Sequence, residues 1–240
     1  GAKAVAFVHA ETSTGVQSDA AALCALAREH GALSIVDAVT SLGGIPVEAD
    51  RWGADAIYSG SQKCLSAPPG LSPLTFSPRA VETIKARKTP VQSWFLDLSL
   101  VMGYWQGGNG GARSYHHTAP INMLYGLHES LRMLHEEGLE QAHARHRANH
   151  ERLRDGLQAI GLALYVGEPH RLPQLNAVAV PQGVDEAAVR RRLLLDHGIE
   201  IGAGLGELAG RIWRIGLMGH GSTPDSVDRV LAALASVLER

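Results

Sequence analysis

Cysteine is scarce in this sequence, and its scarcity argues against a disulfide-stabilised fold. The 240 residues include only Cys24 and Cys64, which are too few for a disulfide framework and are not spaced as a metal-binding pair. Disulfide-rich domains belong to oxidising compartments, whereas free thiols persist in reducing ones. We therefore expect a cytoplasmic protein.

The sequence also lacks a block of basic residues, a long apolar run and a recognisable signal peptide. Its formal net charge is −2, whereas a nucleic-acid surface needs clustered lysine and arginine. A helix that spans a bilayer needs about 20 consecutive apolar residues, and the sequence has no such run and no secretory signal. With 45% hydrophobic residues, the composition is that of a globular protein. We expect it to bind neither nucleic acid nor membrane.

What the sequence does contain is one lysine in a loop of small residues, at positions 58–70 (YSGSQKCLSAPPG). Lys63 follows a short strand predicted at Ala56–Tyr58. A lysine that forms a Schiff base needs a close-fitting site that lowers its pKa, and small neighbours would let an aldehyde cofactor approach the backbone. Most loop lysines are simply solvated, so Lys63 alone does not decide the function.

A carboxylate at the end of another predicted strand, Leu33–Asp37, strengthens the cofactor interpretation. Asp37 could simply cap the following turn. However, a pyridoxal phosphate enzyme needs an anion that keeps the pyridine nitrogen protonated, in addition to its lysine. Asp37 and Lys63 both follow strands, where open α/β sheets bind ligands. Together they predict pyridoxal 5′-phosphate as the cofactor.

Five motifs resemble, in order, those of the class V aminotransferases, and most of all the alanine–glyoxylate and serine–pyruvate branch. They are residues 9–15 (HAETSTG), 34–44 (SIVDAVTSLGG), 58–63 (YSGSQK), 114–120 (SYHHTAP) and 212–219 (IWRIGLMG). The resemblance implies a fold-type-I, pyridoxal-phosphate-dependent α/β transferase, with a mainly parallel sheet in a large domain and a small α+β C-terminal domain. It also implies that an N-terminal part of the large domain is missing here. In relatives that part carries a phosphate-binding turn and an aromatic residue that stacks on the cofactor.

The resemblance further implies roles for individual residues. Lys63 would hold the cofactor as an internal aldimine, and Asp37 would stabilise the protonated pyridine. Thr12 would donate a hydroxyl to the cofactor, although a plain hydroxyl-rich turn is an equally good interpretation of the sequence alone. Gln62 would bind a phosphate oxygen or orient the loop.

Three further residues lie beyond the lysine loop. Tyr115 and Thr118 match residues that reach the phosphate of the partner subunit's cofactor, which implies a homodimer with shared active sites. Arg214 lies on an otherwise apolar predicted strand, where an internal salt bridge is the commoner explanation from pattern alone. The resemblance implies instead that it holds the substrate carboxylate, which a planar guanidinium recognises well.

Periodicity predicts two domains, 1–137 and 138–240. In the first, strand 4–9, a helix from Ser18 to about His30 and strand 33–37 form a parallel βαβ unit. A long amphipathic helix from Ile121 is interrupted at Gly138, where the second domain is expected to begin. Further elements are expected as strands at 71–77, 163–166, 176–180, 199–201 and 212–215 and helices at 79–88, 185–197 and 224–239.

Other sites are less well supported by the sequence. Adjacent histidines such as His116 and His117 point apart on a strand and rarely bind one metal. We expect these two to be structural or to support the residues that contact the cofactor. His146 and His150 are four residues apart on a helix but lack the glutamate of a zinc motif, so we expect solvated histidines and no metal. Residues 202–206 (GAGLG) lack the spacing of a dinucleotide loop. The glycine-rich residues 106–111 are expected to form a surface loop rather than an active-site flap. The basic residues Lys85, Arg87 and Lys88 are expected to form a solvated face of a helix.

The expected function is transfer of the amino group of alanine or serine to glyoxylate or pyruvate. Other members of the class remain as alternatives: a ureidoglycine- or aminoethylphosphonate-type aminotransferase, or a cysteine desulfurase. Desulfurases need a mobile catalytic cysteine, and neither cysteine is well placed for that role. An inactive truncated homologue is the alternative of a different kind.

Overall fold

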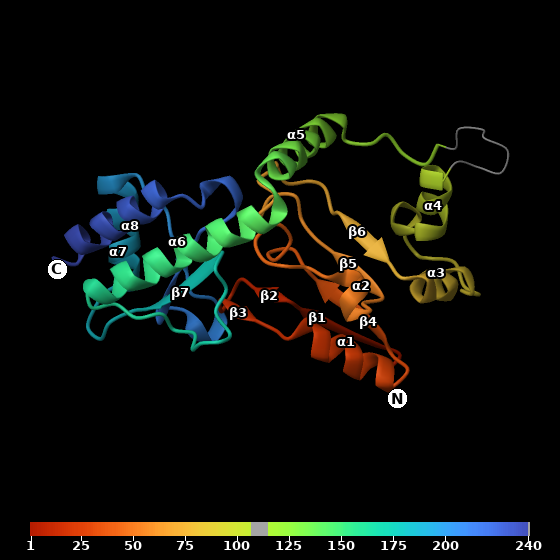
Figure 1. The fold of residues 1–240 in the computed structure, drawn as a ribbon, viewed down its shortest axis with the longest axis horizontal. Helices are drawn as coiled ribbons and strands as arrows, with labels where there is room; N and C mark the ends of the chain where they lie inside the picture. The colour runs from red at the N-terminus through yellow and green to blue at the C-terminus, as the bar shows by residue number, and fades with distance from the viewer. Residues whose placement is uncertain (107–114, 240) are drawn as a thin grey trace.

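The N-terminal part of the chain is built on a four-stranded sheet in the order β1-β4-β5-β6 (Figure 1). The computed structural model describes residues 1–106 and 115–239. Strands β1, β4 and β5 are parallel, and β6 is antiparallel to β5. The strands are Ala4–Val8 (β1), Leu33–Asp37 (β4), Ala56–Tyr58 (β5) and Leu74–Phe76 (β6). The prediction of a mainly parallel sheet is confirmed.

Two helices, α1 (Ala20–Glu29) and α2 (Ala49–Trp52), pack against this sheet. Cys24 of α1 lies in one buried cluster with Val36 of β4 and Ile57 of β5. The N-cap of α1 is Asp19, whose side chain accepts the amide of Ala22, and not Ser18 as the sequence suggested. Both residue types suit the N-cap position.

The middle of the chain is helical, and its long helix is broken where the sequence predicted. Helix α5 ends at Glu137 and α6 begins at Leu139, because Gly138 adopts a φ of 90°, which few other residues tolerate. The predicted glycine-rich loop at 107–111 lies outside the described residues. The elements are α3 (Pro78–Lys85), the 3₁₀ turn η1 (Trp94–Leu96), α4 (Leu98–Gln106), α5 (Ile121–Glu137) and α6 (Leu139–Ala159).

The C-terminal part has its own antiparallel sheet, in the order β7-β9-β8, covered by α6, α7 and α8 (Figure 1). Two predicted strands did not form as expected. Residues 163–166 make only an isolated bridge, from Leu164 to Val178, and residues 199–201 lead into β8. The elements are β7 (Leu175–Ala179), α7 (Glu186–His197), β8 (Gly202–Ala203), η2 (Gly206–Leu208), β9 (Ile212–Gly216), η3 (Gly219–Gly221) and α8 (Pro224–Val237), and a small hairpin near the N-terminus comprises β2 (Ala10–Glu11) and β3 (Val16–Gln17).

The histidines of α6 correct a further prediction. His146 is 0% exposed and His150 is 8% exposed, so neither is solvated. Burial lowers the pKa of both imidazoles, and each finds a hydrogen-bond partner, respectively the carbonyl of Ala142 and the amide of Asn176. They are therefore neutral core residues near pH 7. The periodicity of a histidine-rich helix does not show which histidines face inward.

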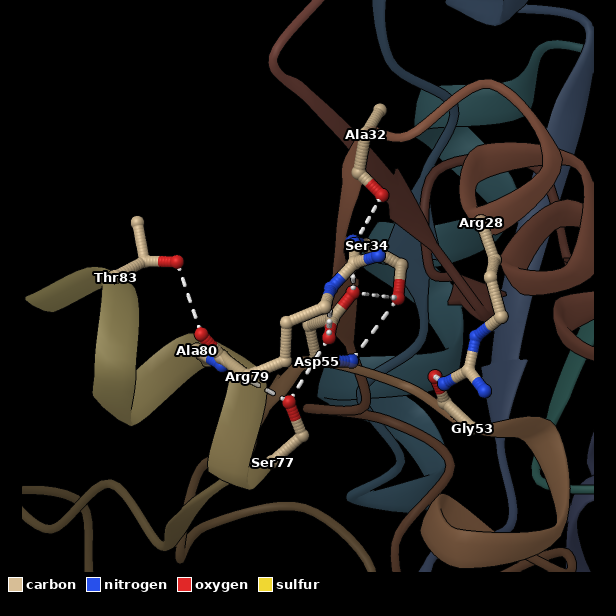
Figure 2. Close-up of polar contacts among 9 residues, drawn as sticks. All are labelled: Arg28, Ala32, Ser34, Gly53, Asp55, Ser77, Arg79, Ala80 and Thr83. Atoms are coloured by element: carbon tan, nitrogen blue, oxygen red, sulfur yellow. Dashed lines mark hydrogen bonds and ion pairs between the residues drawn. The ribbon is translucent and has the colours of Figure 1, made fainter.

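A buried carboxylate joins β4, β5 and α3 at the end of the sheet opposite to the predicted site (Figure 2). Asp55 is 2% exposed and accepts hydrogen bonds from the backbone N–H of Ser34, from the hydroxyl of Ser77 and from two nitrogens of Arg79, at 2.9–3.1 Å. Arg79 also donates to the carbonyl of Ala32. Arg79 therefore anchors α3. This helix ends at Lys85 and not at Lys88 as predicted, and Lys85, Arg87 and Lys88 are exposed as expected.

The Asp55 network should contribute strongly to stability. Burial opposes ionisation of Asp55, but the hydrogen bonds from Ser34 and Ser77 and the charge of Arg79 outweigh it and lower its pKa. We expect Asp55→Ala to lower the free energy of unfolding by about 3 kcal/mol at pH 7, because it leaves buried donors and Arg79 without their acceptor. Urea titration would measure this change.

The same prediction has a pH dependence and a control. Since the folded pKa lies below the unfolded value of about 3.9, the contribution is complete above pH 4 and is lost as the pH falls further. Asp228→Ala removes an exposed pair with Arg152, both side chains being 53% exposed, and should leave stability nearly unchanged. Equal effects of the two substitutions would contradict the role of Asp55.

Candidate active site

The carboxyl ends of β4 and β5 place Asp37 beside Tyr58. The two residues are register partners, and the Tyr58 hydroxyl donates to Asp37 Oδ2 at 2.8 Å. The backbone N–H of Val39 donates to Asp37 Oδ1 at 2.8 Å. The hydrogen bond to Asp37, followed by burial, raises the pKa of the Tyr58 phenol. The carboxylate is therefore held from two sides, and Tyr58 remains a donor at neutral pH.

The loop that follows β5 carries Lys63, and its serines bond to neighbouring backbone. The Ser59 hydroxyl donates to the Ala38 carbonyl at 3.0 Å, which ties this loop to the residue after Asp37. The Ser61 hydroxyl donates to the Pro68 carbonyl at 2.6 Å and closes the far side of the loop. Lys63 itself is half-buried, because the loop folds around it.

Gln62 lies over a glycine in the same loop. A methyl group at Gly60 would lie 2.7 Å from Gln62 Oε1 and 3.3 Å from a methyl of Val39. A side chain there would displace the Gln62 amide from its present position. Gln62 is exposed, and its amide is accessible to a ligand.

Two more predicted residues, Thr12 and Arg214, meet although they are far apart in the sequence. Arg214, on β9, donates through Nη1 to the Thr12 carbonyl at 3.0 Å and through Nε to the Ala203 carbonyl at 2.7 Å. Within residues 1–106 and 115–239 no carboxylate forms an ion pair with it. The internal salt bridge that pattern alone favoured is therefore not present there, and Arg214 keeps an uncompensated charge.

Tyr115 and Thr118 are not brought to the lysine in this chain. Their hydroxyl oxygens are 2.6 Å apart, and in the described part of the chain no hydrogen bond joins them to Asp37 or Lys63. Tyr115 is 66% exposed, whereas its neighbour His116 is 6% exposed and stacks on Trp94 with ring centroids 4.2 Å apart. The two predicted phosphate ligands thus face solvent in the single chain.

Comparison with known proteins identifies the family. The family model of class V aminotransferases matches residues 1–214. The chain belongs to the class V aminotransferase family. It is 41% identical to (S)-ureidoglycine–glyoxylate transaminase of Bacillus subtilis and 44% identical to alanine–glyoxylate aminotransferase of Callithrix jacchus, over 99% and 97% of its length. The crystal structure of alanine–glyoxylate aminotransferase from Nostoc sp. shares 50% identity and a TM-score of 0.93 over 98% of this chain.

The chain spans about 60% of the length of the relatives that it matches. It covers 61% of the Bacillus enzyme, 56% of the Callithrix enzyme and 62% of the Nostoc chain. The mainly parallel sheet and the C-terminal α+β unit are those of a fold-type-I transferase. The predicted family and fold class are both confirmed.

Class V aminotransferases depend on pyridoxal phosphate, and the residues present fit this cofactor. Each oxygen of Asp37 accepts one hydrogen bond, so each has a further lone pair for the N–H of a protonated pyridine. Lys63 supplies an amine in the adjacent loop, and the accessible amide of Gln62 can donate to a phosphate oxygen. No group of three or more metal-ligating side chains occurs among the described residues.

Tyr58 is part of the site, although the sequence pattern predicts it only as the end of a strand. The parallel register puts its phenol on Asp37. The available signal was that both strands end at the same edge of the sheet, each with a polar side chain.

We predict that Tyr58→Phe weakens binding of pyridoxal phosphate. The substitution keeps the ring but removes the hydroxyl that orients Asp37. Loss of this partly exposed hydrogen bond to a carboxylate corresponds to roughly 1 kcal/mol, or about a fivefold increase in the dissociation constant of the cofactor. Absorbance titration of the cofactor would measure it. Tyr165→Phe, at 44% exposure against 41% for Tyr58, is the matched control and should bind normally. Normal binding by both variants would show that the Tyr58 hydroxyl does not orient Asp37.

Proposed function

We propose that this chain carries the lysine-bearing and substrate-binding parts of an aminotransferase that moves the amino group of a small amino acid, alanine or serine, to glyoxylate or pyruvate. The observation that carries the proposal is the contact of Arg214 with the Thr12 loop. It brings the Arg214 guanidinium from the C-terminal sheet to the turn between β2 and β3. This turn follows β1, whose carboxyl end lies beside Asp37 at the sheet edge where the lysine loop begins. Cationic recognition of a carboxylate and cofactor binding then occur in one place.

Each residue has a chemical task in this proposal. Pyridoxal phosphate would supply an electron sink when bound. Asp37 would keep the pyridine nitrogen protonated, and Tyr58 would keep Asp37 oriented. Lys63 Nζ would hold the cofactor and, once released, move the proton at the substrate α-carbon. Arg214 would bind the substrate carboxylate through its guanidinium.

The activities of the relatives support glyoxylate as the acceptor, and they leave the donor open between alanine and ureidoglycine. The desulfurase alternative is weaker. Cys24 is 1% exposed in α1, and Cys64 is 4% exposed with its thiol directed to the Thr40 carbonyl. Burial raises the pKa of the Cys64 thiol to about 12, so it is a poor nucleophile near pH 7.

We also propose the division into domains 1–137 and 138–240, and a cytoplasmic location. The break at Gly138 supports the division, as do separate buried clusters before residue 60 and after residue 150. Two free buried cysteines are compatible with a reducing compartment. None of the described helices has the length and apolar character needed to cross a bilayer.

The cofactor linkage tests the function directly. We expect the protein, mixed with pyridoxal phosphate, to develop an absorbance band that L-alanine converts to that of the pyridoxamine form. In a separate sample, borohydride added before L-alanine should fix the cofactor on a peptide that contains Lys63, and Lys63→Ala should abolish both labelling and turnover. Labelling at Lys85 or Lys88 would contradict the assignment, and the absence of any band would favour the inactive homologue.

A second variant tests the substrate role of Arg214. Arg214→Lys keeps the charge but cannot reproduce a two-pronged contact with a carboxylate. We expect KM for the amino donor to rise at least tenfold while the affinity for pyridoxal phosphate changes little, as steady-state kinetics and cofactor titration would show. The opposite pattern, lost cofactor affinity with an unchanged KM, would make Arg214 a structural residue.

We propose further that two copies of the chain share their active sites. Tyr115 and Thr118 have hydroxyls suited to phosphate, yet they face solvent in one chain. Large apolar side chains on the neighbouring elements are also exposed, and a second copy would cover them. They include Trp94 (56% exposed), Leu96 (68%) and Tyr125 (72%). A two-fold interface over this surface would bring Tyr115 and Thr118 to the partner's cofactor.

Mixed dimers test this proposal. The double variant Tyr115→Phe with Thr118→Val should bind cofactor weakly, and Lys63→Ala should be inactive. When the two are refolded together, one site of each mixed dimer would combine an intact lysine with intact phosphate ligands, and up to about a quarter of the activity should return. If mixed dimers form and remain inactive, the phosphate ligands act within one chain.

A further inference from the structure

One face of α6 holds a single turn of the C-terminal part, residues 219–222. The buried imidazole of His146 accepts the backbone N–H of Gly219 at 2.9 Å, and its other nitrogen pairs with the Ala142 carbonyl at 2.6 Å. Arg145 donates to the carbonyls of Gly219 and Ser222 at 2.7 and 2.9 Å. Asn149 donates to the Ser222 carbonyl at 2.8 Å. The backbone of this turn is therefore fixed to the helix at three points.

The other side of the turn rests on the loop that carries Lys63. The backbone N–H of His220 donates to the Ser66 hydroxyl at 2.8 Å. Gly219, with a φ of 55°, lies so close that a methyl group there would overlap Ser66 Oγ and lie 2.7 Å from the Cys64 carbonyl oxygen. The contact thus joins Ser66, three positions after Lys63, to His220, which lies 154 residues further along the sequence.

Ser66 has an unusual backbone conformation at this contact. Its φ of 60° is in the left-handed region, which residues other than glycine rarely adopt. In that conformation its own N–H donates to the Lys63 carbonyl at 3.0 Å. Such conformations persist where the surroundings hold them, and here the His220 N–H is the group from outside the loop that bonds to Ser66. The turn at 219–222 therefore bears directly on the backbone of the lysine loop.

Arg145 extends this connection across the break between the two long helices. Its Nε and Nη2 bind both carboxylate oxygens of Glu137, the last residue of α5, at 2.6 and 2.8 Å. The pair spans Gly138, at which the helix direction changes. A cavity of about 360 Å³ opens beside the same junction, lined among others by Ser66, Ser130, Arg145 and His220. A change in the angle between α5 and α6 would thus move the turn that contacts Ser66.

We propose that the 219–222 turn holds the Lys63 loop in its binding conformation, with Ser66 as the positioning residue through which the turn acts. The proposal rests on the proposed function, in which Lys63 binds the cofactor. The C-terminal part then has two tasks at the site. It supplies Arg214 for the substrate, and through Gly219 and His220 it fixes the loop of the lysine.

Three variants and two controls test the proposal. Ser66→Gly removes the hydroxyl and introduces no strain at the left-handed backbone. Gly219→Ala obstructs the contact, and a variant with both changes shows whether they act on one contact. His220→Ala keeps the backbone N–H that makes the bond, and Ser130→Ala removes a hydroxyl that bonds within α5 in the same cavity wall. Both controls should behave as the wild type.

The first measurement needs no cofactor. Hydrogen–deuterium exchange of peptides covering residues 59–70 and 217–223 should accelerate at least tenfold in Ser66→Gly and Gly219→Ala and remain unchanged in the controls. The double variant should exchange no faster than the faster single variant, because one contact is lost in each. Unchanged exchange in Ser66→Gly would overturn the proposal, whether or not the protein binds the cofactor.

The second measurement uses the protein loaded with pyridoxal phosphate. A displaced Lys63 should shift the pH midpoint of the cofactor absorbance by at least 0.5 unit in Ser66→Gly and lower kcat about tenfold, with KM for the donor within twofold of wild type. Faster exchange with a normal midpoint and normal kcat would overturn the positioning role of Ser66. A wild-type protein without any cofactor band would instead refute the proposed function and, with it, this role.

Discussion

The parallel pairing of β4 with β5 is the constraint on which the predicted site depends. It sets Asp37 opposite Tyr58, and it starts the lysine loop at the same edge of the sheet. The pair is also held at its other end, where Asp55 accepts the backbone N–H of Ser34 and its own N–H donates to the Ser34 hydroxyl. A slip of one residue would turn Asp37 and Tyr58 to opposite faces. Polar contacts at both ends therefore select one register.

The C-terminal part reaches this edge through backbone groups more than through side-chain pairs. Arg214 bonds to the Thr12 carbonyl, and the turn at 219–222 contacts Ser66 through the N–H of His220. In addition, Gln174 donates to the Thr40 carbonyl, three residues after Asp37. Backbone contacts of this kind need close approach, which explains the requirement for glycine at position 219. They fix relative position and leave the charge of Arg214 free for a ligand.

Three buried histidines are neutral near pH 7, in accordance with the cost of burying charge. His146 and His150 lie on the side of α6 that faces the core, and burial lowers the pKa of both. His146 bonds to the Ala142 carbonyl and His150 to the side-chain oxygen of Asn176. His9 at the end of β1 is also buried, and burial lowers its pKa to about 4. Of these neutral imidazoles, that of His146 accepts a backbone N–H, from Gly219.

The sequence by itself determined the family, the order of the main elements and the identity of the residues with chemical potential. Strands 33–37 and 56–58 and the break at Gly138 followed from local patterns, because apolar periodicity and glycine act over a few residues. Tertiary structure decided which of those residues meet. The ion pair of Arg79 with Asp55, the bond of Tyr58 to Asp37 and the contact of Arg214 with Thr12 each join residues that are distant in the sequence. His146 is buried only because its side of α6 faces the core. No local pattern encodes such contacts, since they arise only when separate elements pack against one another.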